Sequence, residues 1–366
     1  MVRIIISGYY GFSNAGDEAI LWSLIEQIRE ATPDARITVL SAQPEKTAYD
    51  YDVSAVKRND FIEIIKSLKI SDIFINGGGS LLQDVTSSKS LYYYLILTDL
   101  AKKMGLITAL YSNGVGPINS SFNRYLTKRV LEKTDFLSVR DEDSRAFLRD
   151  IGIRKEVYLT ADPALILEPA STERGREILK SEGIDIENIN SIVGISVRPW
   201  VYDYSEVFAK FSDFISRELK SEILFIPFHG EDDIEVSLKI MKLMNERAHV
   251  IKGIYNPKEL MSIIKRLNLL VGVRLHSLIF AAAVGTPFCG LSYDPKIDGF
   301  LKMFEMEPIG YMDNLDLDTL CSKVEELWAN RESAGKKINE KVIKLSANIK
   351  EHNRQFFDFS GICGRQ

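Results

Sequence analysis

An arginine and a histidine stand two residues apart where an apolar stretch of this sequence ends. The run Leu269–Val273 is typical of a buried strand, and the small-residue stretch Leu278–Val284 after it favours a helix. Ligands of open α/β sheets bind outside the carboxyl ends of the strands. Arg274 would supply a fixed, forked cation there, and His276 a proton that moves near neutral pH. We therefore expect this pair to bind one anion, the alternative being a pair of hydrogen-bonded structural residues.

Three further side chains of the same kind, Arg198, His229 and Lys296, also follow strand-like runs in the second half of the chain. With Arg274 and His276 they give five potential cations at successive strand ends. The chain as a whole is acidic, with a formal net charge of −5. A positive pocket in an acidic protein favours a small polyanionic substrate.

Two glycine-rich loops follow strand-like runs in the first half. The first, Gly8–Glu18, opens a helix, and the second, Asn76–Asp84, begins with an asparagine and a run of glycines. Glycine lets a ligand approach the backbone closely, and a helix start favours anions. Neither loop has the spacing of a dinucleotide-binding or nucleotide-hydrolase loop. We expect these loops to contact a sugar or a phosphate, with helix capping and tight turns as the alternatives. The residues concerned are Asn14, Gly16, Asp17, Asn76, Gly77 and Gly78.

Short β-branched runs alternate with amphipathic helical runs, a pattern that predicts βαβ units and parallel sheets. We predict an α/β fold of two doubly wound, Rossmann-like domains that face each other across a cleft. The N-terminal domain is expected over residues 1–167 and the C-terminal domain over 168–332. A charged helix is expected over 333–366, returning to the first domain. The clearest predicted strands of the first half are Arg3–Ser7, Arg36–Ser41, Ile73–Asn76, Ile107–Ser112 and Phe136–Val139.

The composition is that of an ordinary globular protein, 45% hydrophobic and 27% charged. The negative net charge and the lack of a nucleic-acid motif argue against nucleic acid as a partner. Three cysteines without CxxC spacing predict reduced thiols and no zinc cluster. No signal peptide is expected, and the longest apolar stretch is too short to span a bilayer, so we expect a cytoplasmic protein. Lysines of the C-terminal helix either contact the inner membrane face or form a solvated surface.

These motifs together resemble the polysaccharide pyruvyltransferase family. The resemblance extends over nearly the whole chain, and its carriers are Gly8–Ile20, Asn76–Asp84, Ser138–Ser144 and Arg274–Ser277. It implies a glycosyltransferase-B-like fold, phosphoenolpyruvate as donor and a pair of sugar hydroxyls as acceptor. The closer resemblance is to bacterial members that pyruvylate secondary cell-wall polymers for the anchoring of S-layer proteins. It implies a lipid-linked acceptor ending in β-N-acetylmannosamine, which receives a 4,6-ketal pyruvate in the cytoplasm.

The chemistry of such a transfer assigns roles to the residues. Ketal formation requires protonation of the methylene carbon of phosphoenolpyruvate, attack by one hydroxyl, loss of phosphate and closure by a second hydroxyl. No step requires a metal or another cofactor. Arg274 and His276 are the expected catalytic residues, with His276 as general acid and Asp17 as a candidate base. The expected donor site is Arg140, Arg274, His276 and Lys296. The expected acceptor site is Asn14, Gly16, Asp17, Asn76, Gly77, Gly78, Arg198 and His229.

The role of Arg140 and the function of the protein each have alternatives. Arg140 follows the strand-like run Phe136–Val139 and either holds the donor or pairs with the acids Asp141–Asp143 after it. A nucleotide-sugar-dependent glycosyltransferase of the same fold would also need a cationic pocket, for a diphosphate. A non-catalytic protein that binds sugar polymers is the third possibility, which the density of ionisable residues at strand ends disfavours.

Overall fold

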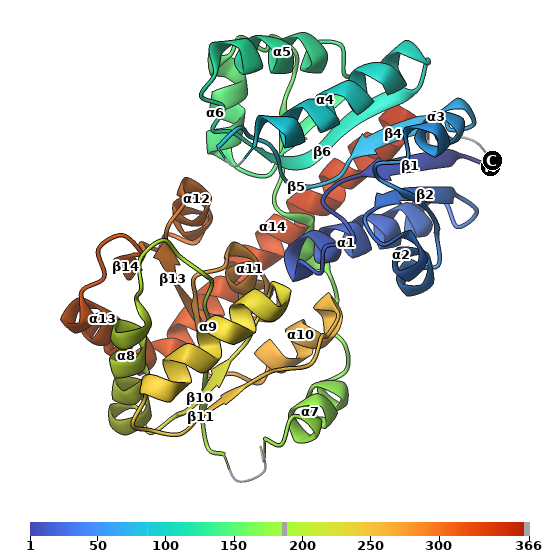
Figure 1. Ribbon diagram of the computed structural model, residues 1–366. Coiled ribbons are helices and arrows are strands. Elements are labelled where there is room, and N and C mark those ends of the chain that lie inside the picture. Colours follow the sequence, from blue (N-terminus) through green and yellow to red (C-terminus); the bar gives the residue numbers. More distant parts are fainter. Residues whose placement is uncertain (86, 185–188, 362–366) are drawn as a thin grey trace. The chain divides into compact units, whose positions relative to one another are not determined.

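The computed structural model describes residues 1–85, 87–184 and 189–361 (Figure 1). The chain divides into two compact units: unit 1 is Met1–Ile166 with Leu345–Gln366, and unit 2 is Leu167–Lys344. The long helix α14 (Arg331–Ser360) contributes its first half to unit 2 and its second half to unit 1. The boundary expected at residue 332 therefore falls inside unit 2.

Unit 1 is built on a parallel sheet. Within the described residues it has eight strands in the order β3-β2-β1-β4-β6-β7-β8, with β5 paired to β6. The order reverses between β1 and β4, so the connections that follow these two neighbouring strands lead to opposite halves of the sheet. The strands are β1 (Arg3–Ser7), β2 (Arg36–Ser41), β3 (Ser54–Lys57), β4 (Ile73–Asn76), β5 (Gly79–Leu82), β6 (Ile107–Val115), β7 (Phe136–Val139) and β8 (Tyr158–Leu159).

Helices cover both faces of the unit 1 sheet, which explains why its strands are apolar throughout. In β1, Ile4 and Ile6 face α1 and the end of α14, whereas Ile5 faces α3 and α4. Phe356 of α14 is buried in the first of these layers. The helices are α1 (Ala15–Ala31), α2 (Pro44–Tyr51), α3 (Phe61–Lys69), α4 (Ser88–Lys103), α5 (Ser121–Leu131) and α6 (Glu142–Asp150), with the 3₁₀ turn η1 (Pro163–Ile166).

Unit 2 repeats this plan with a second parallel sheet. Its strand order within the described residues is β11-β10-β9-β12-β13-β14, which reverses between β9 and β12. The strands are β9 (Ile192–Ser196), β10 (Glu222–Phe225), β11 (Ala248–Val250), β12 (Leu269–Gly272), β13 (Phe288–Ser292) and β14 (Gly310–Tyr311). The helices are α7 (Thr172–Ser181), α8 (Ser205–Glu218), α9 (Gly230–Leu243), α10 (Pro257–Ile264), α11 (Leu275–Ala283), α12 (Pro295–Met303) and α13 (Leu317–Ala329).

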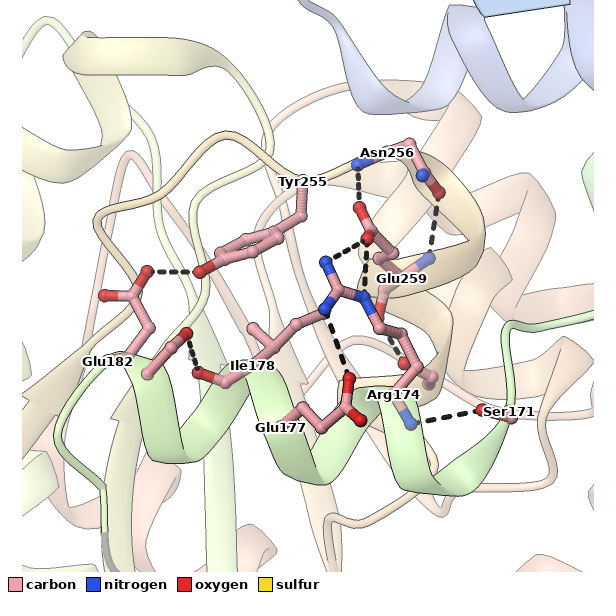
Figure 2. A network of polar contacts seen from close by, with 10 residues as sticks. Ser171, Arg174, Glu177, Ile178, Glu182, Tyr255, Asn256 and Glu259 are labelled. Carbon is pink, nitrogen blue, oxygen red and sulfur yellow. Dashed lines mark hydrogen bonds and ion pairs between the residues drawn. The ribbon is translucent and has the colours of Figure 1, made fainter.

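The first helix of unit 2 is tied to α10 by a network of charged and polar side chains (Figure 2). Arg174 of α7 donates through Nε to Glu259 Oε1 at 2.9 Å. Glu259 also completes a capping box with Asn256 at the start of α10. At the other end of α7, Glu182 Oε1 accepts a 2.7 Å bond from the hydroxyl of Tyr255. One glutamate thus stabilises a helix start and a helix–helix contact together.

The fold confirms the predicted α/β class with two doubly wound parallel sheets. Several elements were not predicted, namely β3, β5, β14, α2 and α12. Strand β5 begins at Gly79, within the run of glycines that was expected to be a loop. Lys296 was expected in a strand-end loop, but it lies in the first turn of α12, which Asp294 caps. Short elements and elements that begin at glycine or proline carry little periodic signal.

Two of the three cysteines lie in the described part of the chain. Cys289 is buried and Cys321 is half-buried, and both are free thiols. Burial raises the pKa of Cys289 to about 12. Cys363 and the last residues of the predicted C-terminal helix lie outside the described residues. No helix in the described part of the chain is both long and apolar enough to cross a bilayer.

Candidate functional site

The point at which the strand order reverses is where open α/β sheets bind ligands. In unit 2 this point lies between β9 and β12, and Arg198 and Arg274 follow those two strands. His276 is the second residue of α11, the helix that follows β12. Arg198, Arg274 and His276 are all half-buried. The topology therefore brings the three cationic candidates to neighbouring strand ends.

Arg274 is held by a buried carboxylate that sequence reasoning missed. Asp233 is fully buried, and its two oxygens accept from Nε of Arg274, at 3.1 Å, and from Nη2. Asp233 Oδ2 also accepts from the backbone amides of Phe228 and His229, at 3.1 and 2.9 Å. A guanidinium has five N–H donors, so a two-point contact with Asp233 orients it while other donors serve a ligand. Asp233 was not among the residues predicted for the site.

The helix that carries His276 begins without a side-chain cap. Arg274 occupies the N-cap position of α11 and makes no side-chain bond to the first turn, while the hydroxyl of Ser277 donates to the Arg274 carbonyl at 2.6 Å. His229, at the N-cap of α9, likewise makes no capping bond. Uncapped helix starts present backbone N–H groups and a partial positive charge, which suit an anion. His276 thus lies at such a helix start, whereas at His229 the acidic residues Glu231, Asp232 and Asp233 in the first turn of α9 offset that positive charge.

Aromatic rings hold the other two cations of unit 2. The guanidinium carbon of Arg198 lies 4.3 Å from the ring centroid of Tyr293 and 5.6 Å from that of Trp200. Lys296 Nζ lies 5.5 Å from the Tyr293 centroid and 3.2 Å from Asp294 Oδ2. Such stacking orients a cation without neutralising it, whereas the pair with Asp294 offsets part of the Lys296 charge. Neither aromatic residue was predicted as part of the site.

In unit 1 the strand order reverses between β1 and β4, and contacts within the protein explain the glycines that follow these two strands. A Cβ on Gly77 would lie 2.0 Å from the Tyr10 hydroxyl oxygen, and one on Gly8 would lie 2.3 Å from the Tyr10 ring. A Cβ on Gly78 would meet Ile20 at 2.8 Å. The reason expected for these glycines was close approach of a sugar or phosphate. The protein's own side chains are enough to explain why these three positions are glycine, and the contact with a sugar or phosphate stays a prediction.

Two of the predicted acceptor residues of unit 1 also have internal partners. Asn14 caps α1, its Oδ1 accepting from the amide of Gly16 at 3.1 Å. Asn76 is buried at the end of β4, and its Nδ2 donates to Thr98 Oγ1 at 2.6 Å. Asp17, in the first turn of α1, is largely buried, with Oδ1 2.7 Å from the Cβ position of Gly79. Asp17 thus places a carboxylate next to Gly79, three residues after β4 ends.

Arg140 is buried in unit 1, in contrast to the partly exposed Arg274. Its Nη1 bonds to Asp162 Oδ2 at 2.8 Å and its Nη2 to Ser80 Oγ at 3.0 Å, while Asp141 lies farther away, at 3.6 Å. Burial by itself lowers the pKa of Arg140, but the charges of Asp162 and Asp141 outweigh it and raise that pKa. Arg140 thus pairs with Asp141, one of the acids after it, and more closely with Asp162, which sequence reasoning missed.

The two doubly wound parallel sheets give the chain a fold of the glycosyltransferase-B-like class. The chain belongs to the polysaccharide pyruvyl transferase family, because residues 14–295 match the model of that family. The amylovoran biosynthesis protein AmsJ of Erwinia amylovora is 21% identical over 397 residues, which cover 92% of this chain and 94% of that protein. The family resemblance predicted from the motifs is confirmed, and the chain is a polysaccharide pyruvyltransferase with a role in polysaccharide biosynthesis.

Solved structures share the fold at low sequence identity. The UDP-GlcNAc 2-epimerase of Neisseria meningitidis, solved with UDP-GlcNAc, is 12% identical with a TM-score of 0.64, over 98% of this chain and 99% of that chain. A glycosyltransferase from Rickettsia africae is also 12% identical, with a TM-score of 0.61 over 100% of both chains. At this identity the likeness is one of fold alone.

Proposed function

We propose that the protein transfers the pyruvyl group of phosphoenolpyruvate to a sugar diol, and that unit 2 binds the donor. The observation that carries this proposal is the set of oriented cations at the β9 and β12 ends. Arg274, fixed by buried Asp233, stands beside the uncapped start of α11, which also carries His276. A phosphate and a carboxylate on one small molecule need several such donors, and Arg–anion forks are the strongest of them. Lys296 supplies further charge, and we now place Arg198, first expected at the acceptor, with the donor, because it follows β9 next to β12.

His276 acts as the general acid in this proposal. It protonates the methylene carbon of phosphoenolpyruvate, which becomes the methyl group as positive charge develops at C2. One sugar hydroxyl attacks C2, the C–O bond to phosphate breaks, and the second hydroxyl closes the ketal ring. One hydroxyl proton replaces the proton that His276 donated, and the other leaves with phosphate. Arg274 and Lys296 stabilise the departing phosphate charge.

The acceptor is assigned to the strand-end loops of unit 1. Asp17 is the candidate base for the attacking hydroxyl, since it is the acidic side chain of the Gly8–Glu18 loop nearest to Gly79. Because Asn14 and Asn76 have internal partners, their proposed contribution is to shape these loops. Arg140 is already bonded to Asp162, which supports a structural role in place of the expected donor contact. The proposed acceptor is a lipid-linked oligosaccharide ending in β-N-acetylmannosamine, pyruvylated as a 4,6-ketal during synthesis of an S-layer-anchoring cell-wall polymer on the cytoplasmic side of the membrane.

A turnover assay tests the donor and the acceptor together. The protein is incubated with phosphoenolpyruvate and a short-chain N-acetylmannosaminyl lipid mimic, and phosphate release is followed while mass spectrometry identifies the product. We expect phosphate release that depends on the mimic, and a product with the mass of a pyruvyl ketal. Phosphate release without ketal product, or no release with any sugar mimic, would contradict the proposal.

A nucleotide-sugar donor is the second candidate, because the epimerase that shares this fold was solved with UDP-GlcNAc. The same incubation with UDP-sugars distinguishes the two, since a glycosyltransferase would release UDP and leave phosphoenolpyruvate intact. Sugar binding without turnover of any donor would favour a binding protein instead. We expect UDP release to stay at background.

A further inference from the structure

One side of unit 1 carries an unusual excess of positive charge. Helices α3, α4 and α5 hold eight lysines and arginines but two acidic residues. Helices α1 and α2 hold two basic and six acidic residues. In Figure 1, α3, α4 and α5 lie on one side of the unit 1 sheet and α1 and α2 on the other. We call the outer surface of α3, α4 and α5 the basic face; it is positive on a chain whose net charge is −5.

Large apolar side chains project from the same surface. Phe61 and Ile62 on α3 are 52% and 68% exposed, and Phe122 on α5 is 61% exposed. Ile96 on α4 and Tyr125 on α5 are exposed as well. Each of these helices buries other residues against the sheet, namely Ile64, Leu68, Leu97 and Leu131. The exposed residues are therefore not needed for the core, and clustered exposed apolar side chains mark interaction sites.

Local ion pairs neutralise part of the basic face and leave the rest available. Four of the eight cations are paired: Lys66 with Glu63 and Lys103 with Asp99, each at 2.6 Å, Lys102 with Asp135 at 2.5 Å and Arg124 with Asp150 at 3.6 Å. Among the described residues, Lys69, Lys89 and Arg129 take part in no ion pair, and all three are exposed. Exposed cations beside exposed aromatic and aliphatic side chains are the pattern of surfaces that lie on anionic lipid.

We propose that the basic face docks unit 1 on an anionic phospholipid bilayer, with Phe61, Ile62 and Phe122 entering the interface. This rests on the proposed function in one respect, since a lipid-linked acceptor requires the enzyme to work at a membrane. A second copy of the chain is the weaker occupant: in a two-fold interface each surface meets itself, so the basic faces would repel one another. A peripheral surface of this kind fits a chain whose described helices do not span a bilayer.

Vesicle co-sedimentation tests this surface without any turnover. The full chain is mixed with vesicles of phosphatidylglycerol and phosphatidylcholine, and with vesicles of phosphatidylcholine alone. We expect binding to the anionic vesicles that weakens as salt is raised, because exposed charges are screened. The charge variant Lys69→Glu/Lys89→Glu/Arg129→Glu should weaken the partition by about tenfold or more. The apolar variant Phe61→Ser/Ile62→Ser/Phe122→Ser should weaken it as well.

Matched controls come from two other surfaces. Tyr49→Ser/Lys46→Glu changes an exposed aromatic residue and a cation on α2, on the opposite side of the sheet, and should bind vesicles as the wild type does. Lys341→Glu/Lys344→Glu tests the basic part of α14, the segment first considered for membrane contact, and should also bind normally. All the substituted side chains are on the surface, so melting temperatures should stay close to that of the wild type.

Each outcome decides for or against the basic face. Equal binding to neutral and anionic vesicles, no binding by the wild type, or unchanged binding by both basic-face variants overturns the proposal. Loss of binding in the α14 variant alone moves the contact to that helix and overturns it too. If the wild type dimerises in sedimentation velocity and the apolar variant does not, with no vesicle binding by either, a second copy is the occupant. Phosphate release from a water-soluble acceptor mimic should be the same in wild type and variants. If the wild type releases no phosphate, the proposed function is contradicted, but the vesicle-binding result can still be interpreted.

Discussion

The two units differ in the loops and helix starts at the point where their strand order reverses. In unit 1, side chains of the protein itself occupy the loop after β1. Asn14 caps α1, and Tyr10 fills the space next to Gly8 and Gly77. In unit 2, helix α11 starts without a side-chain cap, and Arg274 is oriented by a carboxylate from another element. A helix start capped by its own side chain offers fewer free N–H donors to a ligand than an uncapped start beside an oriented guanidinium. Changes at Arg274 and His276 of unit 2 should therefore affect turnover, whereas changes at Gly8 and Gly77 of unit 1 should affect stability.

The largest expected effect is on His276 of unit 2. His276→Ala should lower the turnover of phosphoenolpyruvate by roughly 10²–10⁴-fold, because it removes the proposed general acid. Binding of phosphoenolpyruvate, measured by calorimetry, should fall much less than turnover. Steady-state phosphate release measures the first quantity.

The matched control is another histidine of the same unit. His249 lies in the edge strand β11 and contacts Glu222 at 2.8 Å, away from the β9 and β12 ends. His249→Gln should keep turnover near the wild-type rate. If His276→Ala also keeps it, the role of general acid belongs to another residue and the contrast between the units loses its main support.

The next effect concerns the fork that joins Arg274 to Asp233. Arg274→Lys keeps the charge, but a lysine cannot bond Asp233 at two points and a donor phosphate at the same time. Losing hydrogen bonds to charged groups costs about 1.5–3 kcal/mol, so the KM for phosphoenolpyruvate should rise by about 10–100-fold. The same exchange at exposed Arg217, on α8, should leave KM unchanged. A normal KM in Arg274→Lys would place the donor elsewhere.

Much of the fold could be predicted from sequence because buried parallel strands are continuous apolar runs. Strands β1, β2, β4 and β7 have the bounds that were predicted. The partners of the site residues could not be predicted in the same way. Asp233 stands 41 residues before Arg274, so nothing in the local pattern of either residue points to the other. Tyr10 was read as part of a ligand loop, since a sequence does not tell whether a glycine makes room for a ligand or for a side chain of the same protein.

The glycines of unit 1 allow a direct test of that last distinction. Gly77→Ala would place a Cβ 2.0 Å from the Tyr10 hydroxyl oxygen, so it should lower the free energy of unfolding by about 1–3 kcal/mol. Tyr10→Phe removes that oxygen, which has no hydrogen-bond partner among the described residues, and leaves Cζ at 3.3 Å. The double variant Gly77→Ala/Tyr10→Phe should therefore regain most of the lost stability in urea denaturation.

Gly8 supplies the control for this rescue. A Cβ on Gly8 would meet ring carbons of Tyr10 at 2.3 and 2.4 Å, which Tyr10→Phe does not remove. Gly8→Ala should thus stay destabilised in the presence of Tyr10→Phe. If Gly77→Ala is as stable as the wild type but fails to use the acceptor, the glycine serves the substrate and the contrast between the two units is wrong.

The smallest effect at neutral pH is expected at His352, a histidine that unit 1 buries. Its ring, on α14, lies 5.3 Å from the ring of Tyr111 and 5.5 Å from that of Phe136. Burial lowers the pKa of His352 from 6.5 to about 4, against a smaller opposing effect of Asn353. Between these two values the unfolded chain binds a proton that the folded chain does not, so stability is lost as the pH falls through this window. The slope from this one group is at most about 1.36 kcal/mol per pH unit. His352→Phe should remove that slope in unfolding measurements between pH 7 and pH 5 and leave phosphate release at pH 7 near the wild-type rate. Loss of turnover in His352→Phe without loss of stability would show that unit 1, too, uses a histidine for chemistry.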